Sequence, residues 1–133
     1  MSFIEKITAS QRLRNSLLCI GLDTDINKIP LFLKSYDDPI FEFNKRIIEK
    51  TKDIVCAYKI NIAFYEALGS SGWNTLEKTL KIIPPEIITI ADAKRGDIGN
   101  TSELYAKAFF ETFPFDSITV NPYLGYDSIY PFL

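Results

Sequence analysis

The chain has 133 residues, 47% of them hydrophobic and 24% charged, which is the balance of one folded domain or less. Its formal net charge of -2 at pH 7 gives no basic surface for nucleic acid or an anionic membrane, and no apolar stretch reaches the ~18 residues of a membrane helix. The absence of histidine excludes Ser-His-Asp triads, Cys-His pairs and histidine-ligated metals, so proton transfer must use Asp, Glu, Lys, Tyr or Cys.

In chain order the sequence alternates helical and strand patterns, beginning with a helix. Four short apolar segments bounded by polar or turn residues predict strands at 17–22, 54–60, 87–91 and 117–120. Caps and prolines predict the helices: a capping box of Ser2 and Glu5, the Asp38-Pro39 step, a region broken near Gly69 to Gly72 and ended by Pro84-Pro85, and a start at Asn100 or Thr101.

The spacing of the strands predicts a parallel sheet. Predicted strand starts at 17, 54, 87 and 117 lie 37, 33 and 30 residues apart, which suits right-handed strand-helix-strand units. Two α/β architectures fit: a small doubly wound sheet, or about half of a TIM (β/α)8 barrel, because a complete barrel takes about 250 residues. The apolar residues at 131–133 have no helix after them, so we expect a chain cut from a larger fold.

Polar residues collect where the predicted strands end. They are Asp23 after the first strand, Lys59 and Asn61 at the second, Asp92 and Lys94 at the third, and Asn121 at the fourth. In parallel α/β folds the carboxyl ends of the strands share one rim, and active sites form there. A single residue of this kind can simply mark where burial stops, but four strands that end in this way favour a site.

The segment 91–101 carries the densest pattern of this kind. Asp92 and Lys94 are two apart on a strand, so both side chains point to one face. Gly96 and Gly99 allow sharp turns just beyond them. Asp97 lies in the following loop, where it is either a site carboxylate or a cap for the next helix, and spacing alone leaves both readings open.

Two further features concern the compartment. The first fifteen residues lack an apolar core of signal-peptide length, so we expect a cytoplasmic protein. Cys19 and Cys56 each lie inside a short apolar segment, and we expect both thiols to be free and buried.

Four segments together carry a resemblance to a known family. Residues 92–102 (DAKRGDIGNTS) resemble the signature of orotidine 5'-phosphate decarboxylases, particularly the branch with the longer bacterial-type chain. Residues 19–23 (CIGLD), 57–61 (AYKIN) and 119–125 (TVNPYLG) are similar to that branch at the first, second and fourth strands. The match spans essentially the whole chain in the expected order, and its central motif is long and specific.

The resemblance implies a (β/α)8 barrel, usually a homodimer, that converts orotidine 5'-monophosphate to uridine 5'-monophosphate and carbon dioxide without cofactor or metal. Residues 1–133 would then be a single domain that covers about the first four β/α units, an N-terminal half barrel. By position, Lys59, Asp92, Lys94 and Asp97 would form a charged network with Lys94 as the proton donor.

The resemblance also implies how the nucleotide substrate is held. Asp23 and Lys59 would bind the ribose hydroxyls, and Ile98 would line the pocket. Asp97 and Thr101 would reach into the site of the neighbouring subunit. Phosphate sites in such barrels come from the loops after the seventh and eighth strands, which have no counterpart in residues 1–133. We therefore expect the 133-residue chain alone to have little or no decarboxylase activity.

Two alternatives from other classes stay open. Sister enzymes that act on sugar phosphates through a magnesium-stabilised enediolate share a similar Asp-x-Lys-x-x-Asp pattern. In those enzymes an acidic residue that serves as a metal ligand stands at the position that resembles Lys59 of this sequence. A lysine at that position repels Mg²⁺. The second alternative is a non-catalytic half barrel that binds a nucleotide or another partner without turnover.

Overall fold

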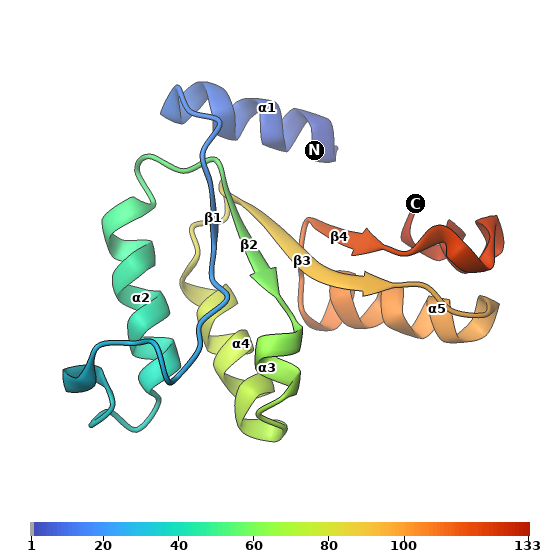
Figure 1. The fold of residues 1–133 in the computed structure, drawn as a ribbon. Helices are drawn as coiled ribbons and strands as arrows, with labels where there is room; N and C mark the ends of the chain where they lie inside the picture. The colour runs from blue at the N-terminus through green and yellow to red at the C-terminus, as the bar shows by residue number, and fades with distance from the viewer. Residues whose placement is uncertain (1) are drawn as a thin grey trace.

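One parallel sheet of four strands organises the chain, whose computed structural model describes residues 2–133 (Figure 1). The strands are β1 (Cys19–Gly21), β2 (Ala57–Asn61), β3 (Ile88–Arg95) and β4 (Ser117–Val120), and they lie side by side in the order of the sequence. All three pairings are parallel. The predicted α/β class and the four predicted strands are confirmed, although β1 is shorter than expected and β3 continues four residues further, to Arg95.

Helices connect the strands as the caps and prolines predict. They are α1 (Phe3–Arg14), α2 (Pro39–Thr51), α3 (Ala63–Glu66), α4 (Ser70–Ile82) and α5 (Gly99–Lys107), which a π-helical turn at Ala108–Thr112 continues. The capping box of Ser2 and Glu5 is formed at the start of α1, and the Asp38 side chain accepts a hydrogen bond from the Phe41 N–H at the start of α2. Short 3-10 turns at Leu31–Leu33, Pro122–Leu124, Tyr126–Ser128 and Tyr130–Phe132 complete the order.

Gly69 lies between α3 and α4 at the predicted break, and Gly72 lies in the first turn of α4. Gly69 has a φ of 62°, a left-handed conformation that glycine adopts without a steric penalty. At Gly72 a Cβ atom would lie 1.9 Å from the Tyr65 carbonyl oxygen, so only glycine lets α4 approach α3 this closely. The pair of short helices therefore folds back as a tight unit after β2.

The hydrophobic core lies between the sheet and its helices. Tyr58, Ile60 and Ala91 of the central strands are 0% exposed and pack with helix residues such as Leu76 and Phe109. The other face of β2 and β3 carries Lys59, Asn61 and Asp92, whose side chains are half-buried. Alternate strand residues therefore divide between a core side and a polar side.

The two cysteines differ from each other. Cys56 is buried as expected, but Cys19 is exposed, so the prediction for Cys19 was wrong. Cys19 belongs to β1, which pairs with β2 on one side only, and this edge position leaves its residues accessible.

The two ends of the sheet are covered unequally. Helix α1 lies across the amino ends of the strands, where Ile7 packs against Cys56, Ala57 and Ile88 (Figure 1). The carboxyl ends carry the predicted polar rim.

Among residues 2–133, no helix has the length and apolar character that crossing a membrane requires.

Candidate active site

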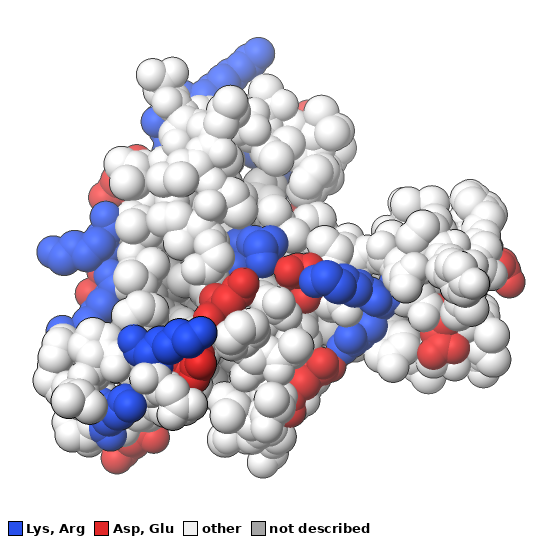
Figure 2. Space-filling model, viewed as in Figure 1, with Lys and Arg blue, Asp and Glu red and all other residues white. Residues whose placement is uncertain are grey.

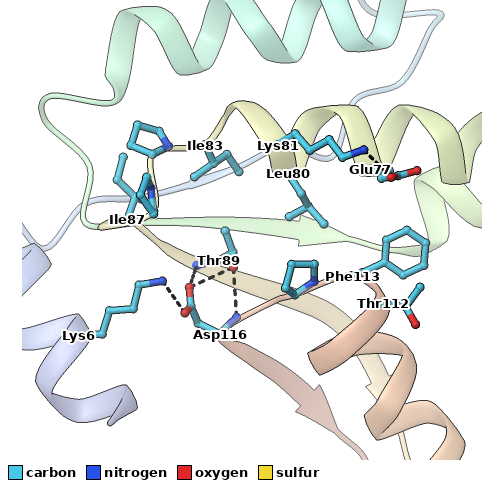
Figure 3. Close-up of a pocket in the computed structure, with 13 residues that line it drawn as sticks. Lys6, Glu77, Leu80, Lys81, Ile83, Ile87, Thr89, Thr112, Phe113 and Asp116 are labelled. Atoms are coloured by element: carbon cyan, nitrogen blue, oxygen red, sulfur yellow. Dashed lines mark hydrogen bonds and ion pairs between the residues drawn. The ribbon is translucent and has the colours of Figure 1, made fainter. Parts of the chain in front are cut away.

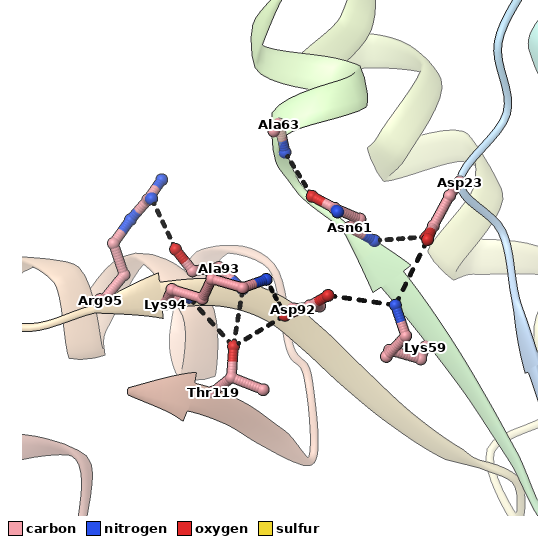
Figure 4. A network of polar contacts seen from close by, with 9 residues as sticks. All are labelled: Asp23, Lys59, Asn61, Ala63, Asp92, Ala93, Lys94, Arg95 and Thr119. Carbon is pink, nitrogen blue, oxygen red and sulfur yellow. Dashed lines mark hydrogen bonds and ion pairs between the residues drawn. The ribbon is translucent and has the colours of Figure 1, made fainter. Parts of the chain in front are cut away.

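Four charged side chains meet at the carboxyl ends of β1, β2 and β3. We call Asp23, Lys59, Asp92 and Lys94 the charged row (Figure 4). Lys59 Nζ lies 3.3 Å from Asp23 Oδ2 and 3.1 Å from Asp92 Oδ2. Lys94 Nζ lies 2.6 Å from Asp92 Oδ1. Acidic and basic side chains alternate across the middle of this face of the molecule (Figure 2).

The register of the sheet brings the row together. Gly21 pairs with Lys59, and Asn61 pairs with Asp92, so residues from distant parts of the sequence become neighbours. The Asn61 N–H donates to Asp23 Oδ1 at 2.9 Å, which anchors the carboxylate that follows β1. The sequence predicted Asn61 at the rim but not its hydrogen bond to Asp23. The backbone N–H makes that bond, and the identity of a side chain does not predict it.

Contacts within the row favour the charged forms of Asp92 and Lys59. The hydrogen bond from Lys94 lowers the pKa of Asp92 to about 2; burial acts in the opposite direction, while Lys59 and Thr119 act with Lys94. Burial on its own would lower the pKa of Lys59, but hydrogen bonds and charge from Asp92 and Asp23 outweigh it and raise that pKa. Asp92 and Lys59 are therefore ionised at neutral pH, and the two acidic and two basic side chains of the row balance in formal charge.

Exposure differs sharply within the row. The side chain of Asp92 is 13% exposed and bonded on both oxygens, whereas that of Lys94 is 67% exposed and has one carboxylate partner. An ammonium group has three donors. Lys94 thus has donors free for a ligand, while Asp92 presents a fixed negative charge beside it.

The other predicted site residues lie outside this row. The Asp97 carboxylate accepts a hydrogen bond from the Ile98 N–H at 2.7 Å, and within residues 2–133 it forms no ion pair. Ile98 is 67% exposed at the start of α5, and Thr101 lies in the first turn of that helix. The structure does not bring Asp97 to Lys94, and the prediction that Asp97 and Thr101 serve a neighbouring subunit stays a prediction.

A buried polar network supports the strand end that carries Asp23. The Tyr65 hydroxyl donates to the Leu22 carbonyl at 2.8 Å, and the Thr24 hydroxyl donates to Asn44 Oδ1 at 2.6 Å. The Asn44 amide in turn donates to the Tyr65 hydroxyl at 2.9 Å and to Thr79 Oγ1 at 3.1 Å. Both neighbours of Asp23 are therefore fixed from the core side, and sequence reasoning missed the network because Asn44 looks like any polar helix residue.

A cavity of about 290 Å³ lies away from the row, toward the amino ends of the strands (Figure 3). Its polar lining includes the Lys81–Glu77 ion pair of α4 and the Lys6–Asp116 ion pair, in which Asp116 also accepts hydrogen bonds from the N–H and hydroxyl of Thr89. These groups satisfy one another and tie α1 to β3 and the start of β4. The cavity is a structural feature of that end of the sheet and contributes nothing to the row.

Comparison with solved structures defines the fold class. The structure of Leishmania donovani OMP decarboxylase superposes with a TM-score of 0.87 at 37% identity, covering 99% of this chain and 49% of that one. A structure of orotidine 5'-monophosphate decarboxylase from Methanocaldococcus jannaschii matches with a TM-score of 0.60 at 25% identity, over 87% of this chain and 47% of that one. The predicted fold, about half of a TIM-barrel protein with its polar rim at the carboxyl ends, is confirmed.

Sequence comparison gives the family. The family model described as Orotidine 5'-phosphate decarboxylase / HUMPS family matches residues 16–133, and the chain belongs to this family. It is 57% identical over 132 residues to the orotidine 5'-phosphate decarboxylase of Christiangramia forsetii, covering 97% of this chain and 48% of the relative. It is 59% identical over 123 residues to that of Flavobacterium johnsoniae, covering 90% and 45%. The chain thus spans about half the length of the curated relatives that it matches.

Proposed function

We propose that residues 1–133 form the N-terminal half barrel of an enzyme that decarboxylates orotidine 5'-monophosphate to uridine 5'-monophosphate in pyrimidine biosynthesis. The charged row is the observation that carries the proposal, because it places two fixed carboxylates and two ammonium groups in contact at the rim of a chain of this family. The reaction proposed here uses neither cofactor nor metal.

The chemical step follows from the charges of Asp92 and Lys94. A substrate carboxylate bound beside Asp92 meets a negative charge whose two oxygens are already bonded to Lys59 and Lys94. As carbon dioxide leaves, its bond to the ring breaks and the electron pair stays on the ring carbon. Lys94, the exposed end of the row, delivers a proton to that carbon, and a proton from water later restores the lysine.

The size of this effect limits what the row can do alone. One charge contact at ~4 Å and an effective dielectric constant near 20 contributes about 4 kcal/mol, or roughly a thousandfold in rate. Enzymatic accelerations typically require ~8 to 23 kcal/mol. Binding of the phosphate and ribose must supply the rest by holding the reacting carbon against Lys94.

The remaining site residues are proposed to bind substrate. Asp23 and Lys59, in contact at 3.3 Å, offer a carboxylate acceptor and an ammonium donor to the ribose hydroxyls. Ile98 is exposed beside the rim motif and would line the pocket. Asp97 and Thr101 would complete the site of a second subunit, which makes the working enzyme a homodimer.

The half barrel alone is proposed to be inactive, because phosphate binding in such barrels uses loops beyond the fourth strand. To test both statements, residues 1–133 are compared with a fusion of this segment to the part of the Christiangramia forsetii relative that it does not cover. We call this fusion the completed enzyme. Uridine monophosphate formation is expected from the completed enzyme and not from the half barrel. Turnover by the half barrel would refute the proposed inactivity, and an inactive, folded completed enzyme would refute the proposed function.

A matched pair of lysine variants tests the role of Lys94. Lys94 and Lys81 are 67% and 69% exposed, and each forms a 2.6 Å ion pair with one carboxylate. In the completed enzyme, Lys94→Ala is expected to lower kcat by about a thousandfold, the value of one such charge contact. Lys81→Ala, on the surface of α4, is expected to leave kcat unchanged. Equal activity of the two variants would remove Lys94 from the mechanism.

The magnesium-dependent alternative is disfavoured by the position of Lys59. Its ammonium group lies between the carboxylates of Asp23 and Asp92, where a divalent cation would have to bind. In residues 2–133, no group of three or more Asp, Glu, Cys or His side chains is placed to hold a metal ion. A metal-dependent activity that a chelator abolishes would restore this alternative.

A further inference from the structure

The ladder between β3 and β4 opens beside the charged row. Ala91 pairs with Ile118, and the next pair is Arg95 with Val120. Between these pairs β3 has three residues, 92–94, whereas β4 has only Thr119. The backbone ladder resumes beyond the gap, where the Asn121 N–H donates to the Arg95 carbonyl at 2.7 Å. One residue of β4 therefore faces a bulge that contains half of the charged row.

The Thr119 side chain fills this gap. Its Oγ1 accepts hydrogen bonds from the N–H groups of Ala93 at 3.1 Å and Lys94 at 3.0 Å, and donates one to Asp92 Oδ1 at 3.1 Å (Figure 4). A hydroxyl has one donor and two acceptor sites, so all three are in use. Because the backbone N–H groups can only donate, the hydroxyl proton must point to Asp92.

This arrangement controls how the Asp92 carboxylate is turned. Thr119 and Lys94 both bond Oδ1, while Oδ2 faces Lys59 at 3.1 Å. Each oxygen is thus assigned to one lysine. A neutral donor from the next strand fixes the carboxylate plane without adding charge to the row.

The same hydroxyl holds the backbone of Lys94. Lys94 has a positive φ of 52°. Among the non-glycine residues of 2–133, only Asn15 shares a positive φ. Residues with a Cβ atom adopt this conformation when surrounding contacts enforce it. The hydrogen bond from the Lys94 N–H to Thr119 is such a contact. It fixes the backbone of the bulge from which the exposed Lys94 side chain extends.

We propose that Thr119 is a positioning residue of the site, which sets the Asp92 carboxylate and the Lys94 backbone through its single hydroxyl. The inference rests on the proposed function for its kinetic consequence, but the positioning itself can be measured without turnover. Thr119 touches no substrate in this proposal. It acts through the two charged residues that it bonds.

Paired substitutions separate the hydroxyl from the shape of the side chain. Thr119→Val keeps the size and branching but removes the donor and both acceptors, whereas Thr119→Ser keeps the hydroxyl. Thr89→Val is the matched control, because Thr89 also bonds an aspartate carboxylate, Asp116, but at the amino end of β3. Thr119→Cys, with a weaker donor and acceptor, gives an intermediate case if the valine variant does not fold.

The first readout is amide hydrogen exchange in the 133-residue chain, followed by NMR. In Thr119→Val the Ala93 and Lys94 amides are expected to exchange about fivefold faster, the factor that corresponds to about 1 kcal/mol for one ordinary hydrogen bond. Exchange at Ile88 and Ile90 is expected to stay unchanged. The pKa of Asp92, read from its carboxylate carbon, is expected to rise. Thr119→Ser and Thr89→Val are expected to match the parent chain at Ala93 and Lys94.

The second readout is kinetic and uses the completed enzyme. Thr119→Val is expected to lower kcat by roughly 10- to 100-fold, the range for one hydrogen bond to a charged group, with a smaller change in KM. Thr119→Ser is expected to restore kcat. A change in KM alone, or equal loss in the serine and valine variants, would overturn the positioning role.

The two proposals can fail separately. If the parent completed enzyme is folded but inactive, the proposed function fails, and the exchange and pKa measurements alone decide the role of Thr119. If the parent is active while Thr119→Val keeps its kcat and its protected Lys94 amide, the inference fails and the proposed function stands.

Discussion

Asn44 offers the sharpest test of how the fold supports the site. Its side chain is 0% exposed and forms three hydrogen bonds, with Thr24, Tyr65 and Thr79. Each such bond contributes ~1 kcal/mol net, and a buried donor left without a partner loses at least ~1 kcal/mol more. In Asn44→Ala the Thr24 hydroxyl loses its acceptor, whereas the Tyr65 and Thr79 hydroxyls keep theirs at Leu22 and Thr75.

The expected loss in the free energy of unfolding for Asn44→Ala is therefore about 4 kcal/mol, three bonds and one orphaned donor. Tyr65→Phe removes its bond to the Leu22 carbonyl and the acceptor of one Asn44 N–H, which is left without a partner, so about 3 kcal/mol is expected from two bonds and one orphaned donor. Urea unfolding, with constant m values, measures both.

The control for this series is Asn27→Ala. Asn27 is exposed, and its bond to Asp25 is made by its backbone N–H rather than by its side chain, so the substitution keeps this bond. A change within ~0.5 kcal/mol is expected for such a surface position. If Asn44→Ala and Asn27→Ala lost the same free energy, the buried network would not stabilise the fold, and the argument that it fixes the strand end carrying Asp23 would fail.

Three other perturbations test separate features of the fold and site. Gly72→Ala places a Cβ atom 1.9 Å from the Tyr65 carbonyl oxygen, and a destabilisation of about 3 kcal/mol or more is expected in calorimetry, because α3 and α4 must move apart. Asp92 has a pKa of about 2, below the ~3.9 of the unfolded chain, so its stabilisation is complete above roughly pH 4 and is lost as the pH falls toward 2. As the pH is lowered from 5 to 2, the free energy of unfolding measured in urea should therefore fall less steeply for Asp92→Asn than for the parent chain. Equal slopes would contradict the low pKa of Asp92. Arg95→Met removes the ion pair with Glu66 and the guanidinium contacts with the Tyr105 and Phe109 rings, but it keeps the apolar part of the side chain. The free energy of unfolding in urea is expected to fall by ~1 to 3 kcal/mol. An unchanged unfolding midpoint would show that these Arg95 contacts do not stabilise the fold.

The strands and their order could be predicted because consecutive apolar residues and regular spacing are local signals. The same signals overestimated β1, which spans Cys19–Gly21 rather than 17–22. Leu17 is apolar but 80% exposed, so hydrophobicity alone placed it in a covered strand. Whether an apolar residue is covered depends on neighbours that only the assembled sheet supplies.

The charged row could also be predicted, since the carboxyl ends of parallel strands meet at one rim. Asp92 and Lys94 do lie together, but the regular alternation used to predict this does not hold at Lys94, whose φ is 52°. The bulge depends on the pairing of β3 with β4, a property of two segments about 25 residues apart. Thr119 was visible only as one letter of a family motif, and nothing in its local sequence distinguishes a ladder threonine from one that bonds a carboxylate.

Asp92 and Lys94 illustrate two ways in which this sheet holds a charge. Asp92 is bonded by Lys59 from β2, by Lys94 from its own strand and by Thr119 from β4, so one carboxylate connects three strands. Any change at Asp92 alters both the chemistry of the row and the cohesion of the sheet, and the two effects cannot be separated by substitution. Lys94 has a mostly exposed side chain with a single carboxylate partner, and exposed pairs of this kind contribute little to stability. The stability of the fold therefore depends little on the ion pair of its proposed proton donor, whereas the fold sets that lysine in place through its backbone.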